Sequence, residues 1–368
     1  MKYLLACGGT AGHINPAIAI AALIKKEDSD AEIVFVGTKS GMENEFVSRE
    51  GYPIYHINVR GLSRKLSLSS LHALALAAIA PHSARKIIKA VRPDIVIGTG
   101  GYVSWPLAVA AHKMKLPVLL HESNALPGLA VRMSEKYADR ILLQFEAAKT
   151  HLKYKKKCAV VGSPLRQGFR IDKAEAKRRI GVPTDLPLVL SFGGSLGAMG
   201  LNREVMRYLA KHKNGTPKCY WIHGCGKSTY YDIKTEAEDL PSRFRILPYI
   251  ENMPVVMAAA DITVTRAGAI TLSELAAAKA ASILVPSPFV ADNHQEKNAE
   301  ALRNSGAAIL ILEKDISSKL AETVDTLLAD REARRRLSDN ISRFFMTDTD
   351  IKIAAEIKKA LQKYSKKL

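Results

Sequence analysis

Short apolar runs alternate with amphipathic stretches along nearly the whole chain. Thirteen such runs occur, among them Lys2–Ala6, Ile54–Val59 and Ala307–Leu312. Most are continuously apolar, which is typical of parallel strands covered by helices on both faces. The alternation continues over 368 residues, which is more than one core usually holds. The sequence therefore predicts doubly wound α/β domains, two in number.

The two halves of the chain contain similar segments. Leu5–Gly12 reads LACGGTAG and Leu190–Gly197 reads LSFGGSLG, and DIVIGTGGYVS from Asp94 resembles DITVTRAGAIT from Asp261. Each segment combines a strand, a loop of small residues and an Ala-rich helix. We therefore predict related domains over residues 1–162 and 163–347, with the boundary near GSPLRQG. A basic helix over about 348–368 begins with TDTD, which suits an N-cap, and it can pack back on the first domain.

The charge balance calls for an anionic partner. Lys and Arg number 54 and Asp and Glu 36, which gives a net charge of +18. Nucleic acid is the weakest candidate, because aromatic residues are only 6% and no RNP-like or zinc-finger pattern occurs. A phosphate-rich substrate and an acidic membrane surface remain. The four cysteines follow no metal-ligand spacing, and no export signal or membrane-spanning run is evident, so we expect reduced thiols in the cytoplasm.

Three glycine-rich loops each follow a predicted strand and precede a predicted helix. They lie at Gly8–Gly12, Gly98–Gly101 and Gly193–Gly197. Glycine allows a tight turn and a close approach of an anion, and the helix dipole favours negative charge there. The spacing matches neither the dinucleotide fingerprint nor the Walker pattern. One such loop is equally well a structural turn, but three together predict more than one phosphate-bearing ligand.

Several polar residues at strand ends and helix starts are candidate functional groups. His13, at the end of the first loop, is a candidate general base or a packing residue. Glu122 and Asn124 follow a strand at the edge where α/β sheets bind ligands. Glu274, one turn into a helix, can accept two ribose hydroxyls or simply complement the helix dipole. The run DNHQEKNA, Asp292–Ala299, suits sugar recognition or a polar loop.

At this level of detail the chain resembles one family of glycosyltransferases. Seven motifs occur in the order seen in the peptidoglycan N-acetylglucosaminyltransferases that convert lipid I to lipid II: Gly8–His13, Gly98–Ser104, His121–Asn124, Gly162–Arg166, Gly193–Gly197, Arg266–Glu274 and Asp292–Asn298. The resemblance implies two Rossmann-like doubly wound domains facing a cleft, the GT-B arrangement. It implies inverting transfer of N-acetylglucosamine from UDP-N-acetylglucosamine to undecaprenyl-diphospho-N-acetylmuramoyl-pentapeptide.

The resemblance also assigns residues to a donor site, mostly in the second domain. The backbone of Ile250 is expected to read the uracil and Glu274 the ribose. The diphosphate is assigned to Ser195, Ile270, Thr271 and Arg166, and the sugar to Ala269, Gln295, Asn298 and Asn124. The acceptor diphosphate in the first domain is assigned to Gly8, Gly9, Thr10, Gly12, Gly100, Gly101 and Tyr102, with Thr10 and Gly12 also expected to serve the donor. The chain departs from the family pattern at Ala11, Leu196 and His294.

An inverting transfer needs a base for the acceptor hydroxyl and a stabilised leaving diphosphate. His13 is the first candidate for the base and Glu122 the second. The third-loop amides, the helix start at Thr271 and Arg166 are expected to stabilise the leaving group, with no metal or cofactor. The two Asp-x-Asp sequences, at Asp28 and Asp348, are interpreted as caps and turns.

An apolar stretch between basic clusters suggests contact with a membrane. Leu71–Ala80, including Leu74 and Leu76, lies between Arg60, Arg64 and Lys65 and Arg85, Lys86 and Lys89. It is either an interfacial segment beside anionic lipid or a buried helix with a basic end. The expected partners are UDP-N-acetylglucosamine, lipid I, an anionic membrane surface at the cytoplasmic face and other cell-wall synthesis proteins, without nucleic acid. A UDP-N-acetylglucosamine epimerase of similar fold is the alternative.

Overall fold

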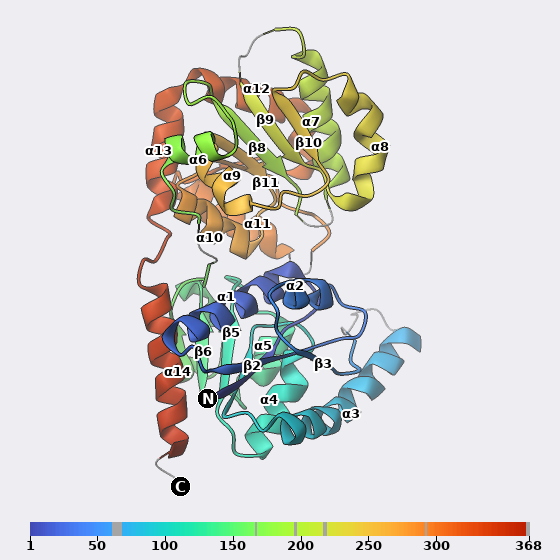
Figure 1. Cartoon of the computed structure of the whole chain (residues 1–368), viewed down its shortest axis with the longest axis vertical. Coiled ribbons are helices and arrows are strands. Elements are labelled where there is room, and N and C mark those ends of the chain that lie inside the picture. The colour runs from blue at the N-terminus through green and yellow to red at the C-terminus, as the bar shows by residue number, and fades with distance from the viewer. Residues whose placement is uncertain (61–67, 166–167, 195–196, 216–218, 291–292, 366–368) are drawn as a thin grey trace. The chain divides into compact units, whose positions relative to one another are not determined.

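The computed structural model describes the chain except for residues 61–67, 166–167, 195–196, 216–218, 291–292 and 366–368. The chain divides into two compact units. The first combines Met1–Leu165 with Met346–Leu368, and the second is Arg166–Phe345. Each unit is built around one parallel sheet with helices on both faces (Figure 1).

The first unit contains a seven-stranded sheet in the order β3-β2-β1-β4-β5-β6-β7. The strands are β1 Lys2–Ala6, β2 Glu32–Gly37, β3 Ile54–His56, β4 Ile95–Gly98, β5 Val118–Glu122, β6 Arg140–Leu143 and β7 Cys158–Val160. The direction of winding reverses between β1 and β4, which pair in parallel with Ala6 opposite Gly98. Such a reversal opens a crevice at the carboxyl ends of the strands, where doubly wound folds bind ligands.

The helices of the first unit bury both faces of this sheet. They are α1 Ala11–Glu27, α2 Glu43–Arg49, α3 Leu68–Val91, α4 Ser104–Lys113, α5 Leu129–Ser134 and α14 Thr349–Ser365, with short 3-10 helices η1 Glu146–His151 and η2 Lys155–Lys157. Leu5 and Ile97 pack in one core with α1 and α14, whereas Leu4 and Val96 pack in the other with α3 and α4. Burial on both faces explains why these strands are continuously apolar.

The helix α14 completes the first unit although it follows the second in the chain. Its Ile353 and Ile357 are buried in the core beside α1. Its Glu356 pairs with Arg140 of β6, and Lys363 lies 2.6 Å from the carboxylate of Asp139. Figure 1 shows this helix running beside β6 and α1.

The second unit repeats the same winding with six strands in the order β10-β9-β8-β11-β12-β13. The strands are β8 Leu188–Phe192, β9 Tyr220–Gly224, β10 Phe244–Leu247, β11 Ile262–Thr265, β12 Ser282–Leu284 and β13 Ile309–Leu310. The helices are α6 Lys173–Arg179, α7 Met199–Lys211, α8 Lys227–Glu238, α9 Met253–Ala259, α10 Ala269–Ala278, α11 His294–Asn304, α12 Ile316–Ala329 and α13 Arg331–Ser342, with the 3-10 helix η4 Glu313–Asp315. The winding here reverses between β8 and β11, so each unit has its own crevice.

Candidate functional site

The first two glycine loops pack against each other at the crevice of the first unit. Gly100 and Gly101 both have positive φ angles, +102° and +72°. A Cβ atom on Gly101 would lie 2.2 Å from the carbonyl oxygen of Gly8, and one on Gly100 would lie 2.5 Å from Nδ1 of His13. Only glycine fits at these two positions, because a side chain would clash as well as strain the backbone.

His13 lies in the first turn of α1 and is half-buried. Its Nδ1 atom is 3.2 Å from the carbonyl oxygen of Thr99, and the Thr99 hydroxyl donates to the carbonyl oxygen of His13 at 2.6 Å. A carbonyl oxygen can only accept, so we assign the hydrogen of the neutral ring to Nδ1. The lone pair is then on Nε2, which is the arrangement a general base requires.

The first glycine loop exposes its backbone at the start of α1. Gly9, Thr10 and Gly12 are exposed. Thr10 is the N-cap residue of α1, and its carbonyl oxygen accepts from the amide of His13 at 3.0 Å. The backbone of Gly9, with φ of +94°, faces the ring of Tyr102 in the second loop. These residues can bind an anion through their amides and the helix dipole.

Glu122 is almost completely buried, with 2% of its surface exposed. One carboxylate oxygen accepts from the backbone and side-chain nitrogens of Asn124 at 2.9 and 3.0 Å, and the other accepts from the amide of Gly128 at 2.8 Å. Burial raises the pKa of Glu122, and these hydrogen bonds oppose the rise. Both oxygens are thus used to hold Asn124 and the start of α5.

Two further residues support the loops of the first unit, and the sequence-based assignment missed them. The Ser104 hydroxyl donates to the carbonyl oxygen of Gly100 at 2.6 Å. Glu43, which is fully buried, accepts from the amide and hydroxyl of Thr38 at 2.7 and 2.8 Å and packs beneath Gly8. Ser104 closes the motif GTGGYVS, so its position offered a signal, but nothing near Glu43 in the sequence indicated contact with the first loop.

The third glycine loop connects β8 to α7 in the second unit. Ser195 and Leu196 of this loop, and Arg166, lie outside the described residues. Gly197 has a φ of +78°, and a Cβ atom there would lie 2.2 Å from the carbonyl oxygen of Cys225. The side chain of Asn202 donates to that same oxygen at 2.8 Å. The described part of the loop is therefore fixed against the β9–α8 connection.

The start of α10 lies on the other side of the second crevice, after β11. Gly268 is the N-cap residue, and Ala269, Ile270 and Thr271 form the first turn. Their amides point out of the helix start and can donate to a phosphate. Glu274 follows on the same helix and is 8% exposed. The helix thus carries two of the residues predicted to bind the diphosphate, Ile270 and Thr271, and the residue predicted to bind the ribose, Glu274, within two turns.

Three more of the predicted donor residues, Asn298, Gln295 and Ile250, lie in the described part of the second unit. Asn298 is 2% exposed, and its side-chain nitrogen Nδ2 lies 3.4 Å from the carbonyl oxygen of Ala267, just before α10. Gln295 accepts from the amide of Ser287 at 2.9 Å. The side chain of Ile250 is buried against Gly224 at the end of β9. The structure thus brings Asn298 to the loop before α10.

Arg266 contacts several loops at this edge of the second sheet. Its guanidinium donates to the carbonyl oxygens of Val285 and Pro286 at 3.0 and 3.2 Å and forms an ion pair with Glu313. A Cβ atom on Gly200, in α7, would lie 2.2 Å from the Glu313 carboxylate. The sequence motif contained Arg266, but its supporting role depends on contacts that only the fold reveals.

The apolar stretch of α3 is partly core. Leu76 and Ala80 are 7% and 0% exposed, so the expectation that Leu76 contacts a bilayer is wrong. Ile79 is 60% exposed, and the basic residues Arg85 and Lys86 that follow are exposed. The structure does not describe the side chain of Leu74, nor does it describe Arg64 and Lys65. Within the described ranges, no helix has the length and apolar character needed to cross a membrane.

Comparison with known families identifies the class of protein to which this fold and these loops belong. The sequence matches the glycosyltransferase family 28 N-terminal domain over residues 3–143 and the glycosyltransferase family 28 C-terminal domain over residues 188–353. The two matches together cover the three glycine-rich loops and all the strands of both sheets except β7, which lies between the matched ranges. The predicted fold class and the predicted enzyme class, a glycosyltransferase, are both confirmed.

The similarity extends to one particular family of these enzymes. The chain is 43% identical over 361 residues to the UDP-N-acetylglucosamine–N-acetylmuramyl-(pentapeptide) pyrophosphoryl-undecaprenol N-acetylglucosamine transferase of Acetivibrio thermocellus, covering 97% of this chain and 98% of that protein. The crystal structure of Acinetobacter baumannii MurG matches with a TM-score of 0.74 and 26% identity, covering 97% of this chain and 99% of the other. The chain belongs to the MurG family of N-acetylglucosamine transferases, as the sequence motifs predicted.

An epimerase shares the fold at much lower identity. The UDP-GlcNAc 2-epimerase from Neisseria meningitidis matches with a TM-score of 0.66 and 13% identity, covering 98% of this chain and all of the other. At this identity the likeness concerns the fold alone. The epimerase alternative therefore has no support beyond a shared architecture.

Proposed function

We propose that this protein transfers N-acetylglucosamine from UDP-N-acetylglucosamine to the lipid-linked N-acetylmuramyl-pentapeptide that the names of its relatives specify. The observation that carries the proposal is the 43% identity to such an enzyme over 97% of the chain. Similarity of this extent spans both units and all of the glycine loops described above. The product would be the lipid-linked disaccharide used for cell-wall synthesis.

In the first unit, the paired glycine loops would hold the acceptor diphosphate. Supporting this assignment, Gly9, Thr10 and Gly12 are exposed at the start of a 17-residue helix. A diphosphate placed there would gain backbone hydrogen bonds and the favourable field of the helix. Gly100, Gly101 and Tyr102 would complete the binding loop from the neighbouring strand.

His13 would act as the general base of the reaction. The acceptor hydroxyl must lose its proton as it attacks the anomeric carbon, on the face opposite UDP, in an inverting transfer. Nε2 of His13 would take that proton, while the hydrogen bond to Thr99 keeps the ring oriented. Glu122 would position Asn124 for contact with the transferred sugar, since both of its oxygens are already hydrogen-bonded.

In the second unit, the donor would bind at the start of α10. Thr271 and Ile270 would donate amide hydrogen bonds to the diphosphate, and Glu274 would accept from the ribose hydroxyls. The same amides would stabilise the charge that develops on UDP as the glycosidic bond breaks. Ala269, Gln295 and Asn298 would contact the sugar and Ile250 the uracil, with Ser195 and Arg166 assigned by resemblance.

The protein would work at the cytoplasmic face of the membrane, where it would be peripherally bound beside other cell-wall synthesis proteins. The net charge of +18 and the exposed Ile79 beside Arg85, Lys86 and Lys89 support this location. A lipid-anchored acceptor also requires the enzyme to approach the bilayer.

The proposal is tested with radiolabelled UDP-N-acetylglucosamine in the presence and absence of lipid I. Transfer of label to the lipid fraction, only when lipid I is present, is the expected result. Conversion of the labelled sugar to an epimer without lipid I would instead identify an epimerase. Absence of both reactions in folded protein would refute the proposed transfer.

A further inference from the structure

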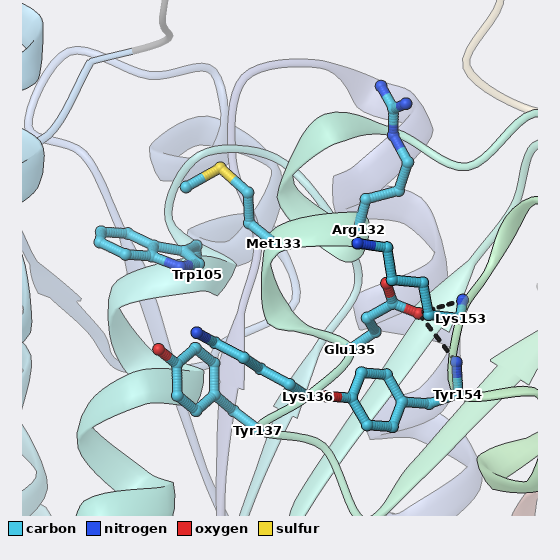
Figure 2. A pocket seen from close by; sticks show the side chains of 8 residues that line it. All are labelled: Trp105, Arg132, Met133, Glu135, Lys136, Tyr137, Lys153 and Tyr154. Carbon is cyan, nitrogen blue, oxygen red and sulfur yellow. Dashed lines mark hydrogen bonds between the residues drawn. The ribbon is translucent and has the colours of Figure 1, made fainter.

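A concave pocket lies in the first unit, outside the loops assigned above (Figure 2). Its volume is about 350 Å³, which is in the range of small-ligand sites. Figure 2 shows aromatic and basic side chains from α4, α5 and the segments that follow α5 and η1. The lining residues are Trp105, Arg132, Met133, Glu135, Lys136, Tyr137, Lys153 and Tyr154.

The charge of this pocket is predominantly positive. Three of its charged residues are basic and one, Glu135, is acidic. Glu135 is 5% exposed, and its carboxylate accepts from the amides of Lys153 and Tyr154 at 2.8 and 3.2 Å. Within the described ranges, Arg132, Lys136 and the Lys153 side chain form no ion pair. Their charge is therefore available to an anionic ligand.

The aromatic rings give the pocket an apolar wall beside these charges. Nζ of Lys136 lies 4.8 Å from the ring centroid of Tyr137, and that ring packs against His112 at 5.5 Å. Trp105 and Met133 lie on the same side of the pocket in Figure 2. A ligand with short apolar groups and at least one negative charge would match this lining.

The pocket is connected to the proposed acceptor site through two helices. Trp105 directly follows Ser104, which hydrogen-bonds Gly100, and α5 begins after Gly128, which hydrogen-bonds Glu122. The ten residues of α4 span about 15 Å. An extended pentapeptide spans up to about 17 Å, so a peptide attached to a sugar at the glycine loops can reach along α4.

We propose that this pocket binds the peptide of the acceptor, with Lys136 and Lys153 contacting its C-terminal carboxylate and Trp105 and Tyr137 contacting its apolar side chains. The inference rests on the proposed function, because the peptide belongs to the proposed acceptor. Any pentapeptide with a free C-terminus carries a carboxylate, which supplies the required charge. A concave pocket suits a short peptide, whereas a bilayer surface would meet a flat or convex face.

Binding is measured directly by tryptophan fluorescence, without catalysis. The chain has two tryptophans, and Trp221 is fully buried in the second unit, so a ligand in the pocket would perturb Trp105. Titration with soluble N-acetylmuramyl-pentapeptide should give a saturable change. We expect the change to disappear in Trp105→Phe and when the C-terminal carboxylate of the peptide is converted to an amide. In Lys136→Gln/Lys153→Gln, the apparent Kd should rise about tenfold. In Lys156→Gln, a matched exposed lysine outside the pocket, it should not change.

Kinetics with two lipid acceptors separates this inference from the proposed function. Lys136→Gln/Lys153→Gln should raise KM about tenfold for the pentapeptide acceptor and leave it unchanged for an acceptor without peptide. An equal effect on both acceptors, or no effect, would overturn the inference while transfer itself continues. If Lys136→Gln/Lys153→Gln instead bound anionic vesicles more weakly and its acceptor KM did not depend on the peptide, the pocket would be a lipid site and the inference would be overturned. Failure of the wild type with every acceptor would instead refute the transfer reaction.

Discussion

Nδ1 of His13 lies 3.2 Å from the carbonyl oxygen of Thr99, a residue of the neighbouring strand end. The contact connects the start of α1 to the loop after β4, across the point where the first sheet reverses its winding. It orients the imidazole and leaves the basic lone pair on Nε2. Gly100 is part of the same arrangement, because a side chain there would occupy the place of the ring.

Replacing His13 should therefore affect the chemical step more than donor binding. His13→Ala should lower kcat by roughly 10²–10⁴-fold, the usual contribution of a general base, with little change in donor KM. The pH–rate profile provides the check, since the acidic limb should disappear with the imidazole. If that limb persists unchanged in His13→Ala, the base is another residue.

Glu122→Gln tests whether this carboxylate positions Asn124 or takes the proton itself. The amide cannot accept through both of its terminal atoms, so one of the contacts to Asn124 or Gly128 is lost. We expect kcat to fall by roughly 10–10²-fold, about the effect of losing one or two supporting hydrogen bonds. The acidic limb of the pH–rate profile should remain as in the wild type. Its disappearance would make Glu122 the base.

Glu274→Ala should raise the donor KM while the protein stays folded. Losing two charge-assisted hydrogen bonds to the ribose should cost on the order of 2–4 kcal/mol. Glu236→Ala, an exposed change on α8, serves as the control and should leave the donor KM as it is. Steady-state kinetics with varied UDP-N-acetylglucosamine measures both variants. A wild-type KM in folded Glu274→Ala would remove this residue from the donor site.

Membrane binding should depend on both charge and the exposed part of α3. Sedimentation with anionic vesicles should decrease as salt rises, because screening shortens the reach of the charges to ~10 Å at 0.1 M. Ile79→Ser should weaken binding at every salt concentration. Ile351→Ser on α14, which is 74% exposed, is the matched control and should bind as the wild type does. Equal sedimentation with neutral and anionic vesicles would contradict the electrostatic part.

Two buried histidines predict loss of stability in mild acid. Burial lowers the pKa of His121 and of His223 to about 4. The unfolded chain, with histidine pKa values near 6.5, takes up protons that the folded chain does not. Stability is therefore full above about pH 6.5 and decreases as the pH falls towards 4, by up to about 1.4 kcal/mol per pH unit for each histidine.

Urea unfolding between pH 7.5 and 5 checks this prediction in the second unit. In a Trp105→Phe background, Trp221 is the single tryptophan, and its indole donates to Ser191, which also contacts His223. His223→Gln should reduce the pH dependence of the transition reported by Trp221, whereas His151→Gln, an exposed change, should not. An identical pH dependence in His223→Gln would show that its buried ring is not responsible.

Much of the fold can be predicted from the apolar runs, but the residues at which the strands end cannot. The run Ile54–Val59 predicts a longer strand than β3, which ends at His56. Ile57 and Val59 are apolar because they are buried in the core, although they lie beyond the paired part of the strand. An apolar run indicates that residues are buried, not that they pair with a neighbouring strand. It therefore overestimates the length of a strand that continues into a buried loop.

The glycine loops of the site could be predicted because their chemistry is local. Glycine and a helix start lie within a few residues of each other in each case. The side chains that hold those loops in place could not be predicted, because the residues in contact are far apart in the sequence. Glu43 packs against Gly8, and Arg266 forms an ion pair with Glu313. Such contacts depend on which strands are neighbours, and the sequence pattern does not give that order.

The position of α14 has a consequence for how the polypeptide folds as it is synthesised. Domains usually fold in the order in which they leave the ribosome. Here the whole of Arg166–Phe345 is available before residues 349–365, which bury Ile353, Ile357 and Ala360 in the first core. The second unit can therefore reach its native state while the first still exposes apolar surface beside α1. During that interval the nascent first unit is the part that chaperones would need to protect.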